Sequence, residues 1–320
     1  MLTFFRHLVP TDRSLFFSRN DRDDPRLGDV VAYDPERFPE EARVVLVGVP
    51  QDEGVRRNGG RVGAAGGPEA IRRALYRLAT YDAERCRSIP RGALFDAGDI
   101  DVGGALEDVH GRLTEVVAAI CDAGLVPLVI GGGHDISYPC IAGASATHGR
   151  LGALNVDAHL DVRPPVPQRN SGTSFRMAID EELIDPSRLV QLGIQPFANA
   201  ESHCRWVEEQ DGRIMTLEQV RRAGVEESLT LAASIAAGHG RFYATLDIDA
   251  VRAADAPGVS ATMSDGLASA DLLRAARMLG EEPRCVALDI AEMNPAYDRD
   301  GITAKLAAHA VVRFVVGRVG

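Results

Sequence analysis

The hydrophobic positions of this chain gather in short continuous runs rather than in alternating patterns. Several of these runs are rich in valine and isoleucine. They predict β-strands at Val44–Val49, Ala93–Ala97, Val126–Ile130, Ala153–Val156, Leu189–Gly193, Phe242–Leu246 and Cys285–Ile290. Continuous apolar runs of this length are typical of strands that are buried on both faces of a parallel sheet.

Amphipathic stretches lie between the predicted strands and indicate helices. In the segment Leu106–Ala123, apolar residues recur at helical spacing, and Gly124 follows as a residue suited to end a helix. A second helix is predicted to begin with Ser269 as its N-cap, to run through Leu279 and to end at Gly280. Strands that alternate with helices require crossover connections, so the pattern predicts an α/β fold.

Length and composition favour a single globular domain. The 320 residues are 45% hydrophobic and 25% charged, and no internal repeat or low-complexity linker interrupts them. We predict one domain over residues 1–320, in which residues 1–40 form an N-terminal arm or surface segment, because the stretch Ser18–Pro39 is polar. The net charge of −11 argues against nucleic acid as a partner.

Neither a membrane location nor an oxidising compartment is indicated. The chain lacks an uninterrupted apolar run of about 18 residues, and residues 1–13 lack the apolar core of a secretory signal. The five cysteines are odd in number and widely spaced, which fits neither a disulfide framework nor a zinc ribbon. We therefore expect reduced thiols and a cytoplasmic protein.

Polar motifs stand at the ends of four predicted strands, where ligands gather in open α/β sheets. In the first, GGGHD, three glycines allow tight backbone turning and deliver His134 to the sheet edge. In the second, NVDAHLDVR, Asp157, His159 and Asp161 alternate, so an extended backbone would place all three on one face. Two carboxylates clustered after an apolar strand repel each other without a cation, which favours a metal site over a solvated strand.

The third and fourth motifs place further carboxylates at later strand ends. LDID contains Asp247 and Asp249 at a spacing of two, with apolar residues on the other side of the strand. In LDIAEMNP, Glu292 emerges where the other strand ends converge, although an ordinary loop glutamate is the alternative for this residue taken alone. The motifs together give six candidate metal ligands: His134, Asp157, His159, Asp161, Asp247 and Asp249.

Two imidazoles and four carboxylates are too many ligands for one ordinary site and suit two divalent ions that share bridging carboxylates. Oxygen and imidazole donors without thiolate favour manganese over structural zinc, although iron and cobalt accept the same donors. Paired ions about 3.5–4 Å apart generate and hold a hydroxide nucleophile, so the sequence predicts a metal-dependent hydrolase. A nucleotide-binding protein that uses the GGG turn is an alternative without a supporting phosphate motif.

The quartet GGGHD, DAHLD, LDID and AEMNP, in this order, resembles the ureohydrolase family of arginases, agmatinases and formimidoylglutamases. The resemblance extends from about Gly54 to Leu306. It implies a three-layer arginase-like fold with a central parallel sheet of about eight strands. It also implies two Mn²⁺ ions per subunit and a homo-oligomer, either a trimer or a hexamer. The ligand sets that it implies are His134, Asp157, Asp161 and Asp247 for one ion, and Asp157, His159, Asp247 and Asp249 for the other.

Within this family, the loops resemble formimidoylglutamase most. The similar segments are RRNGGRVG at 56–63, SGTSF at 171–175, GIQPFAN at 193–199, APGVSA at 256–261 and NPAYDRDGITA at 294–304. Arginases and agmatinases usually carry a histidine where Ser171 stands, and its absence here argues against both activities.

The resemblance leads to the hypothesis that the protein hydrolyses N-formimidoyl-L-glutamate to L-glutamate and formamide in histidine degradation. Asp161 would accept a hydrogen bond from the nucleophile and pass its proton on, and Glu292 would pair with the cationic amidine. Arg163 would bind a substrate carboxylate, with a salt bridge to a ligand aspartate as the open alternative. Asn170 and Ser171 complete the expected substrate-binding residues.

Two other functions stay open. An arginase, an agmatinase or another guanidino-acid hydrolase of the family would need the same metals, and a panel of substrates would separate these activities. A non-catalytic binding protein on the same scaffold would often have lost ligands, whereas all six are present here.

Overall fold

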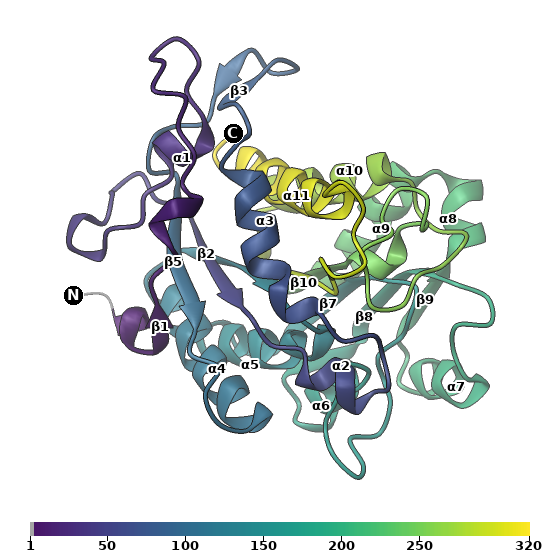
Figure 1. The fold of residues 1–320 in the computed structure, drawn as a ribbon. Coiled ribbons are helices and arrows are strands. Elements are labelled where there is room, and N and C mark those ends of the chain that lie inside the picture. Colours follow the sequence, from purple (N-terminus) through teal and green to yellow (C-terminus); the bar gives the residue numbers. More distant parts are fainter. Residues whose placement is uncertain (1–2) are drawn as a thin grey trace.

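The central feature of the structure is a twisted sheet whose strands run mostly in one direction (Figure 1). The computed structural model describes residues 3–320, and within this range the sheet has nine strands in the order β1-β5-β2-β6-β11-β10-β7-β8-β9. All neighbours are parallel except β1 (Leu8–Val9), which pairs antiparallel with β5 at one edge. The predicted parallel sheet of about eight strands is therefore confirmed.

The seven strands predicted from the sequence are all present. They are β2 (Val44–Val49), β5 (Leu94–Ile100), β6 (Val126–Gly131), β7 (Leu151–Val156), β8 (Ile184–Ile194), β10 (Phe242–Asp247) and β11 (Cys285–Ala291). The remaining parallel strand, β9 (Arg213–Thr216), lies at the other edge and was not predicted, because its four residues include only two apolar ones.

Helices cover both faces of the sheet (Figure 1). One face packs against α3 (Gly67–Leu75), α8 (Leu217–Ala223), α9 (Val225–Ala237), α10 (Ser269–Glu281) and α11 (Ile302–Arg318). The other packs against α4 (Leu106–Asp122), α5 (Ser137–His148), α6 (Ser174–Asp180) and α7 (Glu201–Glu209). These three layers confirm the expected α/β architecture.

Side chains of the central strands alternate between two hydrophobic cores, one on each face of the sheet. On β2, Val44 and Leu46 join the core under α3, α10 and α11, whereas Val45 and Val47 join the core under α4 and α5. Because both faces are covered, the strands contain few polar residues, which explains the continuous apolar runs in the sequence.

The predicted boundaries of the second helix were wrong at both ends. Ser269 is the first residue of α10, and the N-cap is Ala268, whose N–H donates to the Asp271 carboxylate at 3.0 Å. Gly280 does not end the helix but lies inside it, where a Cβ would collide with the carbonyl oxygen of Phe314. The glycine therefore permits the close approach of α10 and α11.

The N-terminal segment, which we expected to form an arm or surface segment, contributes to both cores. Its residues include the edge strand β1 and the short helix α1 (Leu27–Val30), and Phe4 and Leu27 are buried. Other short elements are α2 (Glu53–Arg57) and the hairpin of β3 (Tyr81–Asp82) and β4 (Arg87–Ser88). Among the described residues, no helix is long and apolar enough to cross a membrane.

A buried arginine joins α3 to the sheet. Arg72 is 1% exposed and donates to both carboxylate oxygens of Asp96 at 2.9 Å, and it also bonds Asp99 and the carbonyl of Gly98. The hydroxyl of Tyr76, one turn along the chain, donates to Asp96 as well. Removing one partner from a buried ion pair is costly because the other charge stays buried without compensation.

We expect Arg72→Met to lower the free energy of unfolding by about 3–5 kcal/mol, since Asp96 would lose its cation in the interior. Urea denaturation measures this loss. The matched control is Arg73→Met, which removes an arginine whose ion pair with Glu69 is exposed and should cost less than about 1 kcal/mol. Equal losses for the two variants would contradict the structural role of Arg72.

Candidate metal centre

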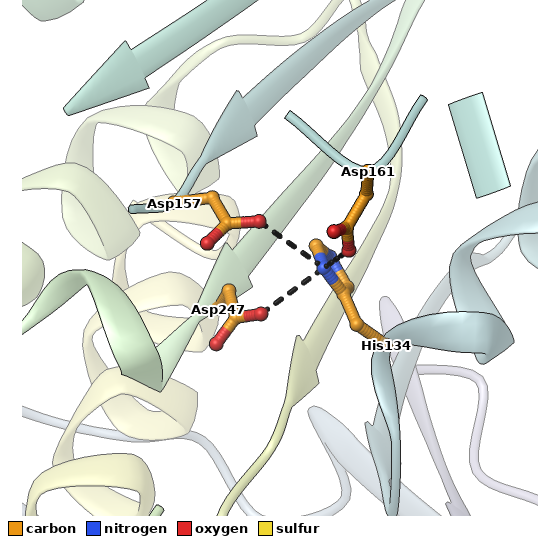
Figure 2. A group of neighbouring side chains, drawn as sticks. All are labelled: His134, Asp157, Asp161 and Asp247. Atoms are coloured by element: carbon orange, nitrogen blue, oxygen red, sulfur yellow. Dashed lines mark hydrogen bonds and ion pairs between the residues drawn. The ribbon is translucent and has the colours of Figure 1, made fainter. Parts of the chain in front are cut away.

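Four side chains converge at the carboxyl ends of β6, β7 and β10 (Figure 2). His134 Nδ1 lies 2.8 Å from Oδ2 of Asp161, 3.1 Å from Oδ2 of Asp247 and 3.4 Å from Oδ2 of Asp157. One ligand atom from each residue lies within 4.8 Å of all the others, which is the spacing that a single bound ion requires. The structure thus brings together four of the six predicted metal ligands at one point.

The backbone beyond β7 and β10 turns at once, so the extended backbone that we expected to place the alternating residues on one face was wrong. Asp157 Oδ1 accepts from the N–H of His159 at 2.8 Å, and Asp247 Oδ1 accepts from the N–H of Asp249 at 2.7 Å. Aspartate favours such a turn because its short carboxylate satisfies a free backbone N–H. In both turns the second oxygen, Oδ2, is left to face His134.

A hydrogen-bond chain fixes the other nitrogen of His134. Nε2 lies 3.0 Å from Oγ1 of Thr245, whose hydroxyl donates to Asp289 at 2.5 Å. Asp289 also accepts from Tyr243 and Ser137. Because Thr245 gives its single hydrogen to Asp289, its oxygen accepts the Nε2–H of His134. The Nδ1 lone pair of a neutral His134 therefore faces the three carboxylates.

The electrostatics of this cluster favour a cation at its centre. Burial and the charge of Asp157 raise the pKa of Asp247 to about 6. Although burial opposes protonation of His134, the charge of Asp247 and the hydrogen bonds to three aspartates raise its pKa well above the usual value. The part of the Asp247 shift that comes from Asp157, and the raised pKa of His134, report an excess of negative charge, which a divalent ion would neutralise. Carboxylate and imidazole donors suit Mn²⁺, so these residues fit such an ion.

The other two predicted ligands adjoin this cluster. His159 Nδ1 lies 3.4 Å from Oδ1 of Asp157, and Asp249 accepts from the N–H of Ala261 through both oxygens, at 3.1 and 3.2 Å. His159 and Asp249 line the same cavity as Asp247. This position is compatible with a second ion, whose site stays a prediction.

Glu292 follows β11 and lies against the GGGHD turn. Its N–H donates to the carbonyl of Gly132 at 2.9 Å, and its Oε1 accepts from the N–H of His134 at 2.6 Å. The other oxygen, Oε2, is buried and has no hydrogen-bond partner among residues 3–320. Burial and the charge of Asp247 raise the pKa of Glu292 to about 8. The glutamate that was ambiguous in the sequence thus belongs to the site.

Two of the residues that surround the site have strained backbones. The φ angles of Asp161 and Glu292 are 49° and 66°, which place both residues in the left-handed region. This conformation costs about 1–3 kcal/mol for residues other than glycine and often marks functional positions. The catalytic roles of Asp161 and Glu292 stay predictions.

A cavity of about 210 Å³ opens beside the cluster. It is smaller than the pockets of about 300–1,000 Å³ that bind drug-sized ligands, so it suits a small metabolite. Besides four of the predicted metal ligands and Glu292, the polar residues on its wall are Asn58, Arg163, Ser171, Asn199, His203 and Ser260. Arg163 forms no ion pair with any described residue, so the alternative salt bridge to a ligand aspartate is not formed.

The loop that contains Asn170 and Ser171 is fixed beside this wall. The N–H of Ser171 donates to the carbonyl of Gly54 at 3.1 Å. Gly172 packs on Arg163, and a Cβ on Gly172 would lie 2.8 Å from the Cδ atom of that arginine. Asn170 does not line the cavity, and its Oδ1 accepts from the N–H of Gly172 at 2.9 Å. Substrate binding by Asn170 stays a prediction, while its observed contact shapes the loop.

Our sequence reasoning missed four polar residues of the wall, namely Asn58, Asn199, His203 and Ser260. The first two and Ser260 lie in loop segments that had drawn attention only by resemblance. His203 lies in the first turn of α7, where no spacing or strand end marks it. Burial lowers the pKa of His203, and the nearby charge of Arg163 lowers it further.

Comparisons with known proteins agree with one another. The model of the Arginase family matches residues 42–317. The chain is 37% identical to a formimidoylglutamase of Geobacillus thermodenitrificans over 276 residues, which cover 84% of this chain and 83% of that protein. It is 38% identical to a formimidoylglutamase of Nocardia farcinica over 297 residues, or 91% of each chain. The solved structure of Trypanosoma cruzi formiminoglutamase with Mn²⁺₂ is similar at a TM-score of 0.87 and 33% identity, covering 93% of this chain and 99% of that one.

Thr245→Val should weaken the binding of Mn²⁺ by about 10- to 100-fold. Loss of the hydroxyl leaves the Nε2–H of His134 without its acceptor, so the orientation of the imidazole ring is no longer fixed. Calorimetric titration of metal-free protein with Mn²⁺ measures the change. Ser137→Ala is the control, since it removes another hydroxyl bonded to Asp289 without touching His134, and it should have a much smaller effect. An unchanged affinity in Thr245→Val would contradict the orientation of His134 described above.

The affinity for Mn²⁺ should fall as the pH is lowered. A ligand must be deprotonated before it binds a metal ion. Asp247 holds a proton below its pKa of about 6, and His134, whose pKa is raised well above its usual value, already holds one at higher pH. We expect a decrease of about tenfold between pH 7 and 6 and a steeper decrease below pH 6, where both ligands compete with protons. Titrations at pH 5, 6 and 7 would test this, and equal affinities at the three values would be the opposing result.

Proposed function

The chain belongs to the arginase family, and from this premise we propose that it hydrolyses N-formimidoyl-L-glutamate to L-glutamate and formamide. The reaction would serve histidine degradation. One observation carries the proposal: a buried cluster of His134 and three aspartates borders a small polar cavity, on whose wall Arg163 forms no ion pair with any described residue. Relatives that carry the name formimidoylglutamase support the choice of substrate.

We propose that the site holds two Mn²⁺ ions. Paired divalent ions supply a hydroxide near neutral pH, because they lower the pKa of a water that they share. The residues that would hold the first ion are His134, Asp157, Asp161 and Asp247. Those that would hold the second are His159 and Asp249 together with the shared carboxylates of Asp157 and Asp247. The excess negative charge of the cluster supports this assignment.

Asp161 and Glu292 would perform the proton transfer and the positioning of the substrate. Asp161 borders the cavity, so it can accept the proton of the attacking hydroxyl and donate it to the leaving nitrogen of glutamate. Addition to the amidine carbon and cleavage of its bond to that nitrogen then give formamide and L-glutamate. Glu292 Oε2, which lacks a partner among residues 3–320, would bind the cationic amidine and hold its carbon near the nucleophile.

Arg163 would bind one of the two carboxylates of the substrate. A guanidinium matches a carboxylate through two parallel hydrogen bonds, and this guanidinium has no competing ion pair among the described residues. Ser171, on the neighbouring loop, would contribute a neutral hydroxyl to the same end of the cavity. These contacts favour a substrate acid over agmatine, which carries no carboxylate.

We also infer a cytoplasmic location and a homo-oligomer, a trimer or a hexamer. The location is supported by the five cysteines, all of which are free. The oligomer follows only from the family resemblance.

Purified protein loaded with Mn²⁺ should release formamide from N-formimidoyl-L-glutamate, and the release should stop when a chelator removes the metal. Arginine, agmatine and 4-guanidinobutyrate complete the panel of substrates, with product formation followed by chromatography. Rapid hydrolysis of one of these three compounds, with no hydrolysis of formimidoylglutamate, would contradict the proposed substrate and identify a guanidino compound instead.

Arg163→Gln should raise KM for formimidoylglutamate by about 10- to 100-fold with a smaller change in kcat, because glutamine cannot form the charged pair with the carboxylate. Steady-state kinetics would show this. The control is Arg176→Gln, since Arg176 in α6 already pairs with Asp180 and lies over the ring of Trp206. If both variants behaved alike, Arg163 would have no special role in binding.

A further inference from the structure

Ser260 carries a hydroxyl that has no hydrogen-bond partner in the described part of the chain. The residue is 5% exposed and lies on the cavity wall beside Glu292. Its Oγ is buried and forms no hydrogen bond with any residue from 3 to 320. Buried hydroxyls in this state are uncommon because they destabilise a fold, so the position of Ser260 requires an explanation.

The backbone around Ser260 is firmly anchored, in contrast to its side chain. Arg61 donates to the carbonyl of Val259 at 2.5 Å and to the carbonyl of Ser260 at 3.3 Å. On the other side, the N–H of Ala261 donates to the Asp249 carboxylate. The free hydroxyl therefore does not result from a loosely held loop. It is held in place by a predicted metal ligand and by the arginine of an opposing loop.

The neighbouring Glu292 also has a buried oxygen that lacks a hydrogen-bond partner among the described residues. Oε1 of Glu292 accepts from the N–H of His134, while Oε2 is buried without a partner among the described residues. A weak hydrogen-bonding interaction with the Ser260 hydroxyl opposes the rise in the pKa of Glu292, although the two side chains do not reach the geometry of a full hydrogen bond. Within residues 3–320, two neighbouring polar atoms on one cavity wall thus lack a full hydrogen bond, and a ligand with two N–H groups would satisfy both.

We propose that Ser260 Oγ and Glu292 Oε2 together bind the amidine of the substrate, with Ser260 as the second acceptor of its N–H groups. This inference rests on the proposed function. A cationic amidine has N–H donors on both nitrogens, and a single free carboxylate oxygen leaves some of them unpaired in a buried site. The serine hydroxyl accepts one of these hydrogens and can rotate its own hydrogen towards Glu292. Ser260 thereby helps to determine specificity for an amidine.

The proposal predicts that stability and activity respond in opposite ways to loss of the hydroxyl. Ser260→Ala should lower kcat/KM for formimidoylglutamate by about 10- to 100-fold, as expected for a lost hydrogen bond to a cation. Its Tm should be unchanged or higher, because an unpaired buried hydroxyl is removed, and its Mn²⁺ content should be unchanged. Ser260→Gly, which also lacks the hydroxyl, should show the same loss in kcat/KM.

Ser228 in α9 provides a matched control. Its Oγ is also buried without a partner among the described residues, but Ser228 does not line the cavity. Ser228→Ala should leave Tm unchanged or higher, as in Ser260→Ala, and should leave kcat/KM at the wild-type value. A kinetic loss in Ser228→Ala equal to that in Ser260→Ala would overturn the assignment of Ser260.

Inhibition by the product gives a readout that is specific for the amidine. L-Glutamate keeps the carboxylates of the substrate but lacks the amidine, so its inhibition constant should be unchanged in Ser260→Ala and raised in Arg163→Gln. An unchanged kcat/KM in Ser260→Ala, or weaker glutamate binding that matches the kinetic loss, would overturn the role of Ser260. If the wild-type protein did not hydrolyse formimidoylglutamate, the proposed function itself would be overturned. The wild-type assay is done first, so this failure is distinguished from a failure of the role of Ser260.

Discussion

An imidazole nitrogen that faces three carboxylate oxygens in the protein interior is the arrangement on which the rest of the site depends. The three carboxylates repel one another and would move apart if their side chains were free to move. The arrangement persists because three of its four members are fixed by a hydrogen bond made elsewhere: His134 to Thr245, and Asp157 and Asp247 to the backbone that follows them. A cation among these oxygens would neutralise their mutual repulsion, which is why we interpret the cluster as a metal centre.

Sequence reasoning succeeded where a residue's surroundings are set by the whole fold and failed where they are set by a local contact. The central strands were predicted because burial on both faces removes polar residues from them. The edge strand β9 was missed, since an edge lacks that constraint. Gly280 was taken as a helix end, but its small size serves contact with Phe314, a residue 34 positions away. No local pattern contains that information.

The site shows the same division. The prediction that Asp157, Asp161 and Asp247 converge relied on strand ends sharing one edge of the sheet, and this holds even though the backbone there is turned. The cavity wall could not be derived in this way. His203 reaches it on α7, and Ser260 reaches it through contacts of its neighbours with distant side chains. Such positions depend on how loops pack, which spacing along the chain does not encode.

The turns that follow Asp157 and Asp247 have a consequence for the metal-free protein. Asp157 and Asp247 each use one oxygen to hold the chain in its turn, so the ligand framework exists before an ion arrives. Capture of an ion then requires little ordering of the backbone, so the free energy that such ordering would cost is spared. The metal-free chain accordingly holds these two predicted ligands ready for an ion.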